Sequence, residues 1–235
     1  MSQPTASRAL SRTETSEAVA DVGWRLILGR LEALVPVAST RDALAVADLV
    51  TTTLGQLADE HLFLNVRPHV VALSLATRST GAVTDRDVAL ARVASEALTA
   101  AGYALAPPTS AHVPRPVQIL EICIDAIDIA AIRPFWKAVL GYAEFVGDNN
   151  TLLDPTDAMP AIWFQQMDVA RPQRNRIHFD IAVAHDEAEA RVNAALAAGG
   201  HMVNDSFARA FWVLADAEGN EVCVCTWLDR DERGW

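Results

Sequence analysis

The second half of the chain carries one pattern of apolar and polar positions twice. Residues 119–141 and residues 176–199 each begin with alternating apolar and polar side chains, break at a short polar segment, and continue with helical spacing to a glycine. Alternation with a period of two is typical of a half-buried strand, and the later spacing is typical of an amphipathic helix. Further short strands follow each helix, so each copy predicts a β-α-β-β-β module. A repeated unit favours two modules packed about a pseudo-dyad, with a small-molecule cleft where their sheets meet.

The first half of the chain predicts a smaller α+β unit with two strand regions. Residues 24–37 are typical of a strand or hairpin, and residues 66–77 are typical of a single strand. In the second of these regions, Val71, Leu73 and Leu75 share one face.

Two helices are expected between and after these strands. The first covers residues 39–59. Its apolar stripe consists of Leu44, Ala47, Val50, Leu54 and Leu57. The second begins at Thr84, which forms a capping-box pattern with Asp87, and ends at Gly102.

A proline-rich segment divides the chain. Residues 106–116, APPTSAHVPRP, contain four prolines and no strand or helix periodicity, which is typical of a semi-rigid linker. We therefore expect a disordered lead-in over residues 1–21, a first domain over 22–105, this linker, and a second domain over 117–235. The predicted fold class is α+β for both domains.

Composition and charge narrow the function classes. At 235 residues, 51% hydrophobic and 21% charged, the chain has enough apolar material for two well-filled cores. A net charge of -11 without a basic cluster argues against nucleic acid or an anionic membrane as a partner, and no apolar run could cross a bilayer. Three cysteines make no disulfide framework, and the lead-in lacks the apolar core of a signal peptide. We expect a cytoplasmic protein with a small-molecule partner.

The first domain resembles the pterin-4a-carbinolamine dehydratase family over residues 22–104. The resemblance is carried by residues 58–91, where Thr77 and Asp87 match the strand end and the helix start of the family. The helix-start motif reads Gly81-Ala82-Val83-Thr84 in this chain. The resemblance implies an α+β fold, and the matching residues are turn and capping devices that preserve the fold rather than the chemistry.

The catalytic positions of that family are altered. Its adjacent histidines and proline fall on Glu60, His61 and Leu62, and its strand-end histidine falls on Arg78. The family uses histidines to move protons, whereas an arginine stays protonated near neutral pH. We expect the dehydratase reaction to be lost and keep His61 as the candidate of this domain, although a lone histidine near a helix end is also typical of a surface or capping residue. Pterin binding with residual 4a-hydroxytetrahydropterin dehydratase activity is kept as an alternative.

Residues 117–229 resemble the glyoxalase/bleomycin-resistance superfamily, also called the vicinal oxygen chelate superfamily. The resemblance rests on FW at 135–136 with LG at 140–141, on RNRIHFD at 174–180, and on WVLADAEGNE at 212–221. It implies a domain of two βαβββ modules that assembles into dimers or larger homo-oligomers. In metal-dependent members, the first and last strands of each module supply one ligand each to a divalent ion in the cleft.

Strand alternation predicts which side chains face that cleft, because successive residues of a strand point to opposite faces. The polar faces of three strands comprise Glu121, Cys123 and Asp125; His178 and Asp180; and Glu221, Cys223 and Cys225. The apolar faces of the same strands should pack on the helices.

The ligand positions of the superfamily fall on a mixed set of side chains. The opening strands place Glu121 and His178 there, and the closing strands place Cys223 and residues 163–165, which include Gln165. A hard divalent ion prefers carboxylates and imidazoles, whereas zinc would tolerate the thiol. We assign no metal ligands from the sequence, leave the cofactor unknown, and keep a divalent metal as an alternative.

We predict Glu121 and His178 as the catalytic pair, because a carboxylate and an imidazole facing one cavity can exchange protons near neutral pH. The predicted ligand-binding residues are Trp163, Gln165, Asp180, Trp212 and Cys223. Each prediction has a structural alternative, such as a carboxylate paired with an arginine, a satisfied histidine, a core tryptophan or a small buried thiol. The sequence thus predicts a small-molecule-binding, glyoxalase-like protein and leaves two functions open. One is a lyase or isomerase that uses acid/base or metal-assisted chemistry, and the alternative is a non-catalytic ligand-sequestering or sensing protein.

Overall fold

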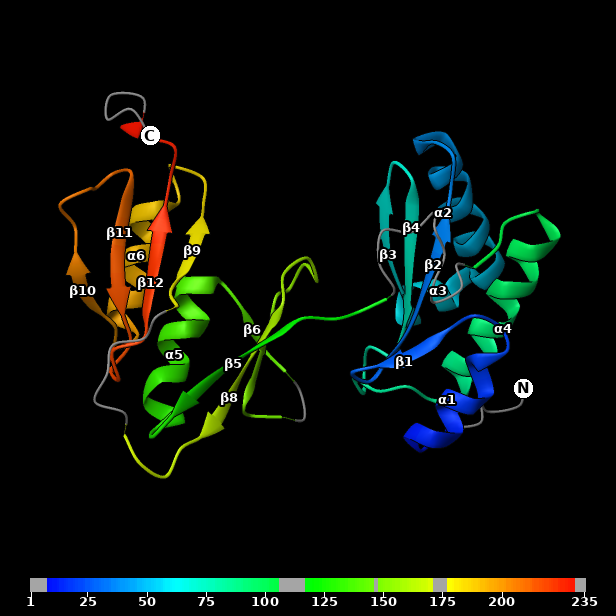
Figure 1. The fold of residues 1–235 in the computed structure, drawn as a ribbon, viewed down its shortest axis with the longest axis horizontal. Helices are drawn as coiled ribbons and strands as arrows, with labels where there is room; N and C mark the ends of the chain where they lie inside the picture. Colours follow the sequence, from blue (N-terminus) through cyan, green and yellow to red (C-terminus); the bar gives the residue numbers. More distant parts are fainter. Residues whose placement is uncertain (1–7, 106–116, 146–147, 171–176, 231–235) are drawn as a thin grey trace. The chain divides into compact units, whose positions relative to one another are not determined.

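The computed structural model describes residues 8–105, 117–145, 148–170 and 177–230 (Figure 1). The chain divides into two compact units, Met1–Ile119 and Leu120–Trp235, and each has its own hydrophobic core. The linker predicted at residues 106–116 lies outside the described residues. In the described part of the chain, no helix is long and apolar enough to span a membrane.

The first unit is an α+β unit with a four-stranded antiparallel sheet of order β1-β2-β4-β3. Its strands are β1 (Arg25–Ile27), β2 (Arg30–Pro36), β3 (Leu62–Arg67) and β4 (Val70–Leu75). Its helices are α1 (Arg12–Ala20), α2 (Thr40–Leu54), the short α3 (Ala58–His61) and α4 (Asp85–Ala100), with a 3-10 turn η1 (Gly55–Leu57) between α2 and α3. Helices α2 and α4 contact each other and the sheet.

Alternation along the two central strands forms the core of this unit. Leu31, Ala33 and Val35 of β2 are buried, and Leu73 of β4 lies opposite Ala33 in the register. Helices that cover one face of a sheet shield this apolar face from water. The alternation predicted for β4 is therefore confirmed.

The apolar stripe predicted for α2 is confirmed at Val50 and Leu54 and is wrong at Leu44. Leu44 is exposed, whereas Ala43, Val46, Val50 and Leu54 are buried. The buried set keeps the three- and four-residue spacing of a helix face. The predicted and the buried positions both have helical spacing. The packing of α2 against α4 and the sheet determines which of them are buried.

The single strand predicted over residues 66–77 is one arm of a hairpin. Strands β3 and β4 pair in antiparallel register around a turn at residues 68–69. The outer half of β3 is exposed, so its apolar alternation is too short to identify from the sequence.

The lead-in expected to be disordered over residues 1–21 contains the helix α1. Ser11 and Glu14 form a reciprocal capping box, in which each side chain accepts a hydrogen bond from the other residue's backbone N–H, at 3.2 and 2.8 Å. Val19 of α1 is buried in the core of the first unit. The cap and this contact order a segment whose polar composition resembles that of a flexible tail.

The second unit consists of two βαβββ modules, as predicted (Figure 1). The first module contains β5 (Glu121–Ala126), α5 (Ile129–Leu140), β6 (Ala143–Glu144), β7 (Thr151–Leu153) and β8 (Ala161–Gln166). The second contains β9 (Phe179–Ala182), α6 (Ala188–Ala197), β10 (His201–Asn204), β11 (Phe211–Ala215) and β12 (Glu221–Cys225). The sheets have the orders β5-β8-β7-β6 and β10-β11-β12-β9, and the opening and closing strands of each module are parallel neighbours.

One apolar core joins the two modules. Helices α5 and α6 contact each other, and the core includes Ile124 and Phe164 from the first module with Leu214 and Val222 from the second. One face of each sheet is therefore apolar and covered. Because side chains alternate along a strand, the residues between these positions project from the opposite face.

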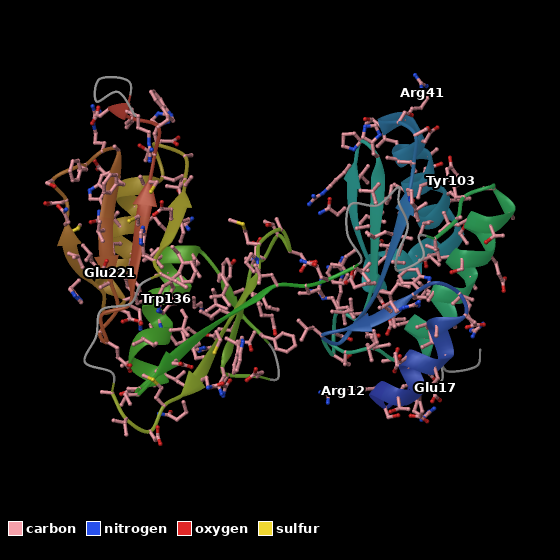
Figure 2. The ribbon with its side chains drawn as sticks, viewed as in Figure 1. Arg12, Glu17, Arg41, Tyr103, Trp136 and Glu221 are labelled. Carbon is pink, nitrogen blue, oxygen red and sulfur yellow. The ribbon has the colours of Figure 1, made fainter. Side chains whose placement is uncertain are left out.

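A buried carboxylate links the helix of the first module to a turn of the second. Asp216, which is fully buried, accepts a 2.9 Å hydrogen bond from the indole Nε1 of Trp136 on α5. It also accepts hydrogen bonds from the backbone N–H groups of Glu218 and Asn220 and from the Asn220 side chain, at 2.8 to 2.9 Å. Figure 2 labels Trp136, which projects from α5. The carboxylate thus fixes the β11–β12 turn against the first module.

We expect Asp216→Ala to lower the free energy of unfolding of the second unit by about 3 kcal/mol, because it leaves a buried indole N–H without a partner and weakens the turn. Urea unfolding of the full chain, followed by tryptophan fluorescence, measures this change. The matched control is Asp154→Ala in the equivalent β7–β8 turn, where the carboxylate accepts hydrogen bonds from Thr156, Ala158 and Met159 of its own loop. The control should lose about 1 kcal/mol. Equal losses in the two variants would contradict a linking role for Asp216.

Candidate functional site

The polar face of the second module begins on β9. Phe179 and Ile181 pack into the core, and the Phe179 ring meets the ring of Trp136 edge-on, with centroids 5.8 Å apart. His178 and Asp180 project from the opposite face and are exposed. The Nε2 atom of His178 lies 3.5 Å from the Oδ1 atom of Asp180. The alternation predicted for this strand is therefore present.

Strand β12 adds a thiol to the same face. Val222 and Val224 belong to the core, whereas Cys223 pairs in parallel register with Asp180 of β9. The candidate ligand atoms of His178, Asp180 and Cys223 all lie within 4.8 Å of one another. We call these three residues the His–Asp–Cys cluster. Two of its side chains are exposed and the thiol is buried.

The corresponding face of the first module carries different groups. Glu121 and Cys123 of β5 are exposed, as is Gln165 of β8, and the half-buried Trp163 pairs with Cys123. Among the described residues, Glu121 is not part of the His–Asp–Cys cluster. The structure therefore brings His178 together with Asp180 and Cys223, and places Glu121, Trp163 and Gln165 on the sheet of the first module.

Trp212 lies on the other side of the second sheet. It is buried in the core, and its partner across the β11–β12 pair is Val224. Cys223 projects from the opposite face, so Trp212 does not lie beside the thiol. The core position of Trp212 could be predicted from the alternation along β11, because Trp212 lies on the same face as the buried Leu214.

Burial raises the pKa of the Cys223 thiol to about 12, and a hydrogen bond with Asp180 and the charge of Asp180 act in the same direction. Burial also raises the pKa of Cys225, with Asp180 as the next cause. Only a thiolate is a strong nucleophile, so a protonated buried thiol is unreactive. Cys223 is therefore not an activated nucleophile at neutral pH.

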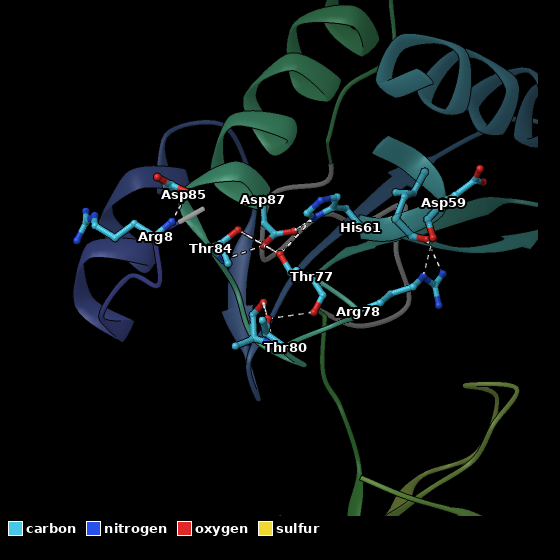
Figure 3. A network of polar contacts seen from close by, with 11 residues as sticks. Arg8, Asp59, His61, Thr77, Arg78, Thr80, Thr84, Asp85 and Asp87 are labelled. Carbon is cyan, nitrogen blue, oxygen red and sulfur yellow. Dashed lines mark hydrogen bonds and ion pairs between the residues drawn. The ribbon is translucent and has the colours of Figure 1, made fainter. Parts of the chain in front are cut away.

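His61 of the first unit is buried, which corrects the interpretation of a surface or capping residue. Its Nδ1 atom lies 2.7 Å from the Oδ1 atom of Asp87 at the start of α4 (Figure 3). The hydroxyl of Thr77 donates to Asp87 at 2.8 Å, and the backbone N–H of Thr84 donates to it at 2.7 Å. A buried carboxylate needs such partners. The sequence identified Asp87 and Thr77 only as helix-start and strand-end residues, and the fold makes them partners of His61.

Arg78, which follows Thr77 of this network, is fixed by contacts with its neighbours. Its guanidinium lies 3.7 Å from the ring centroid of Phe63, and it donates hydrogen bonds to the carbonyl oxygens of Asp59 and Leu62, each at 3.0 Å. Stacking on an aromatic ring and several donated hydrogen bonds are typical of a fixed arginine.

Comparison with known proteins identifies the class of the second unit. Residues 121–225 match the family model of a glyoxalase-like domain. Similar solved structures include the fosfomycin resistance protein FosX from Mesorhizobium loti, at 9% identity and a TM-score of 0.40, which covers 50% of this chain and 98% of that chain. A glyoxalase/bleomycin resistance protein/dioxygenase family enzyme from Burkholderia phytofirmans PsJN has 18% identity, a TM-score of 0.39, and coverages of 46% and 97%. A glyoxalase-related enzyme from Fulvimarina pelagi has 17% identity, a TM-score of 0.37, and coverages of 46% and 87%.

The second unit therefore contains a glyoxalase-like domain of the vicinal oxygen chelate superfamily. No curated protein matches the chain significantly. The matched residues all lie in the second unit, so the resemblance of the first unit to the dehydratase family stays a prediction.

The superfamily's metal arrangement does not fit the residues of this chain. It would draw ligands from both modules, but Glu121 is separate from the His–Asp–Cys cluster among the described residues, and the closing strand of the first module offers Gln165. Hard divalent ions require several oxygen ligands at one point.

We expect iodoacetamide to label Cys223 much more slowly than Cys123 in the native full chain at mildly alkaline pH. The Cys223 thiol is buried and its pKa is raised to about 12, whereas Cys123 is exposed, although partial burial and Asp125 raise its pKa too. Peptide mass spectrometry after timed quenching gives both rates. The variant Asp180→Asn should speed the labelling of Cys223, since loss of the neighbouring charge lowers its pKa. Labelling of Cys223 at the rate of Cys123 would contradict this description.

Proposed function

We propose that the second unit binds a small oxygenated metabolite on the polar faces of its sheets and acts on it as a lyase or isomerase, by acid/base or metal-assisted chemistry. The observation that carries the proposal is the His–Asp–Cys cluster, which projects from the face of β9 and β12 that the helices do not cover. The glyoxalase-like fold of residues 121–225 supports small-molecule binding.

His178 and Glu121 carry the proposed chemistry. Imidazole is the side chain that changes charge nearest to neutral pH, and a carboxylate 3.5 Å away favours one orientation of its ring. Glu121 occupies the equivalent position of the first module and offers an exposed carboxylate. Such groups support proton abstraction beside a carbonyl, isomerisation or dehydration. Trp163, Gln165, Asp180 and Cys223 are the proposed ligand-binding residues.

A non-catalytic ligand-sequestering or sensing protein is the alternative. It is favoured by residues 163–165, where metal-dependent members of the superfamily carry a metal ligand and this chain has no anionic side chain. Assembly into a homo-oligomer is part of both proposals. Binding without any product separates the alternative from the enzyme.

The first unit gives a second candidate function, pterin binding, which the buried His61–Asp87 pair favours. The dehydratase reaction itself is proposed to be lost, because Arg78 stands at the position of the strand-end histidine and its guanidinium is held by two carbonyl oxygens and the Phe63 ring. An arginine that stays protonated cannot relay a proton.

A panel of small 2-oxo and 2-hydroxy acids, screened by quenching of tryptophan fluorescence and by product analysis, tests the role of the second unit. We expect Glu121→Gln and His178→Ala each to lower turnover about 100-fold or more, without loss of folding stability, because proton transfer by a positioned group contributes at least that much. The control is His201→Ala, an exposed histidine on β10, which should keep full turnover. If both site variants keep full activity, the assignment is wrong.

A thermal-shift measurement with a tetrahydropterin tests the first unit. A ligand at 100 times its dissociation constant stabilises the folded state by about 2.7 kcal/mol, so binding should raise the melting temperature of the full chain. The variant His61→Asn should lose this shift, and His69→Ala, an exposed histidine of the same unit, should keep it. No shift in the unaltered protein removes the pterin proposal.

A further inference from the structure

We propose that a groove on the outer side of α5 binds a small organic carboxylate with a flat apolar body. The groove has a volume of about 470 Å³. Small-molecule sites typically measure about 300 to 1,000 Å³. Its lining comes from α5 and from the residues that follow this helix as far as β6. None of the lining residues belongs to the His–Asp–Cys cluster, so the inference does not rest on the proposed function of that cluster.

Helical spacing gives α5 a core face and a groove face. The buried core face consists of Ile132, Phe135, Trp136 and Val139. The groove face consists of Arg133, Pro134, Lys137 and Ala138. Residues four apart on a helix are neighbours, so the two basic side chains lie side by side and the other two residues add apolar surface next to them. The groove thus combines positive charge with an apolar lining.

The two basic side chains have unused capacity to bind an anion. The Oε1 atom of Glu144 lies 3.1 Å from Nζ of Lys137 and 3.5 Å from Nη1 of Arg133, and the second distance exceeds the roughly 2.7 to 2.9 Å of a charge-assisted hydrogen bond. Asp148, whose pKa the charge of Arg133 also lowers, accepts its shortest hydrogen bond from Thr151 of its own turn, at 2.6 Å. The Nε atom of Arg133 is buried and has no hydrogen-bond partner among the described residues. A ligand carboxylate that displaces Glu144 would provide the missing acceptor.

The end of α5 does not oppose a bound anion. Backbone N–H groups of the two residues after the helix donate to the carbonyl oxygens of Lys137 and Ala138, and Nη1 of Arg191 donates to that of Val139 at 3.2 Å. These bonds satisfy acceptors at the negative end of the helix dipole. Arg191 also brings a third positive charge near the groove, since a Cβ atom on Gly141 would lie 3.0 Å from its Nη1 atom.

The uncharged parts of the lining select the body of the ligand. The hydroxyl of Tyr142 donates a 2.8 Å hydrogen bond to the carbonyl oxygen of Pro160, which fixes the orientation of the ring. Burial raises the pKa of Tyr142 to about 12, so the phenol stays neutral and does not repel an anion. This ring, with Pro134 and Ala138, suits a flat hydrocarbon group. The guanidinium and the ammonium suit its carboxylate.

Lys137 is the only lysine of the chain, which makes the groove accessible to a selective label. Reductive methylation of the full chain with isotope-labelled formaldehyde adds labelled methyl groups to Lys137 and to the N-terminal amine, and both amines keep their charge. We expect benzoate to shift the Lys137 methyl signal in NMR spectra in a saturable way and to leave the N-terminal signal in place. Benzamide has the same shape without the charge and should bind at least about 10-fold more weakly.

Variants of the groove separate binding from folding. Arg133→Gln should weaken benzoate binding at least about 10-fold, which is the effect of losing a hydrogen bond to a charged group. The matched control is Arg209→Gln, whose exposed side chain pairs with Asp229 outside the groove and which should bind benzoate like the unaltered protein. Glu144→Gln should tighten binding roughly 2- to 5-fold, because it removes the carboxylate that competes for the same cations.

A variant that only failed to fold would not bind benzoate more tightly, so the gain expected in Glu144→Gln does not depend on the stability of Arg133→Gln. Absence of a saturable shift with benzoate, an equal response to benzamide, or unchanged or weaker binding in Glu144→Gln would each overturn the inference. The measurements involve no residue of the His–Asp–Cys cluster and no turnover. Failure of this site and failure of the proposed function are therefore told apart.

Discussion

The arrangement of the second unit depends on one buried carboxylate. Asp216 holds the turn before β12 and accepts a hydrogen bond from the Trp136 indole of α5, so it joins the helix of one module to the closing turn of the other. Glu218 of the same turn accepts hydrogen bonds from the backbone N–H groups of Ile127 and Asp128, just before α5 begins. A negative charge at the start of a helix is favourable. These bonds hold α5 of the first module against the β11–β12 turn of the second.

This constraint determines where chemistry can occur. Because the helices cover one face of each sheet, the alternate residues of β9 and β12 project from the other face. The parallel register then places Cys223 beside Asp180, and polar side-chain atoms of His178, Asp180 and Cys223 lie within 4.8 Å of one another. The first module repeats the architecture but carries Glu121 at the place of His178 and Trp163 at the place of Cys223. The two copies of the repeat have thus kept one fold while their polar faces have diverged.

Local periodicity was sufficient to predict the two βαβββ modules and the alternating faces of their strands, because both depend on the spacing of apolar residues that are close in the sequence. The His–Asp–Cys cluster as a unit could not be predicted, since the pairing of Asp180 with Cys223 depends on the register of strands far apart in the sequence. Trp212 shows the opposite case: alternation with Leu214 already indicated a core position. The burial of His61 depends on Asp87, which tertiary structure brings to it.

The central claim is that the polar face of β9 and β12 is the functional face of the second unit. A crystal structure of the full chain with a bound ligand from the panel of 2-oxo and 2-hydroxy acids tests it most directly. The account predicts ligand density within hydrogen-bond distance of His178 and Asp180. Ligand density away from both residues would contradict it.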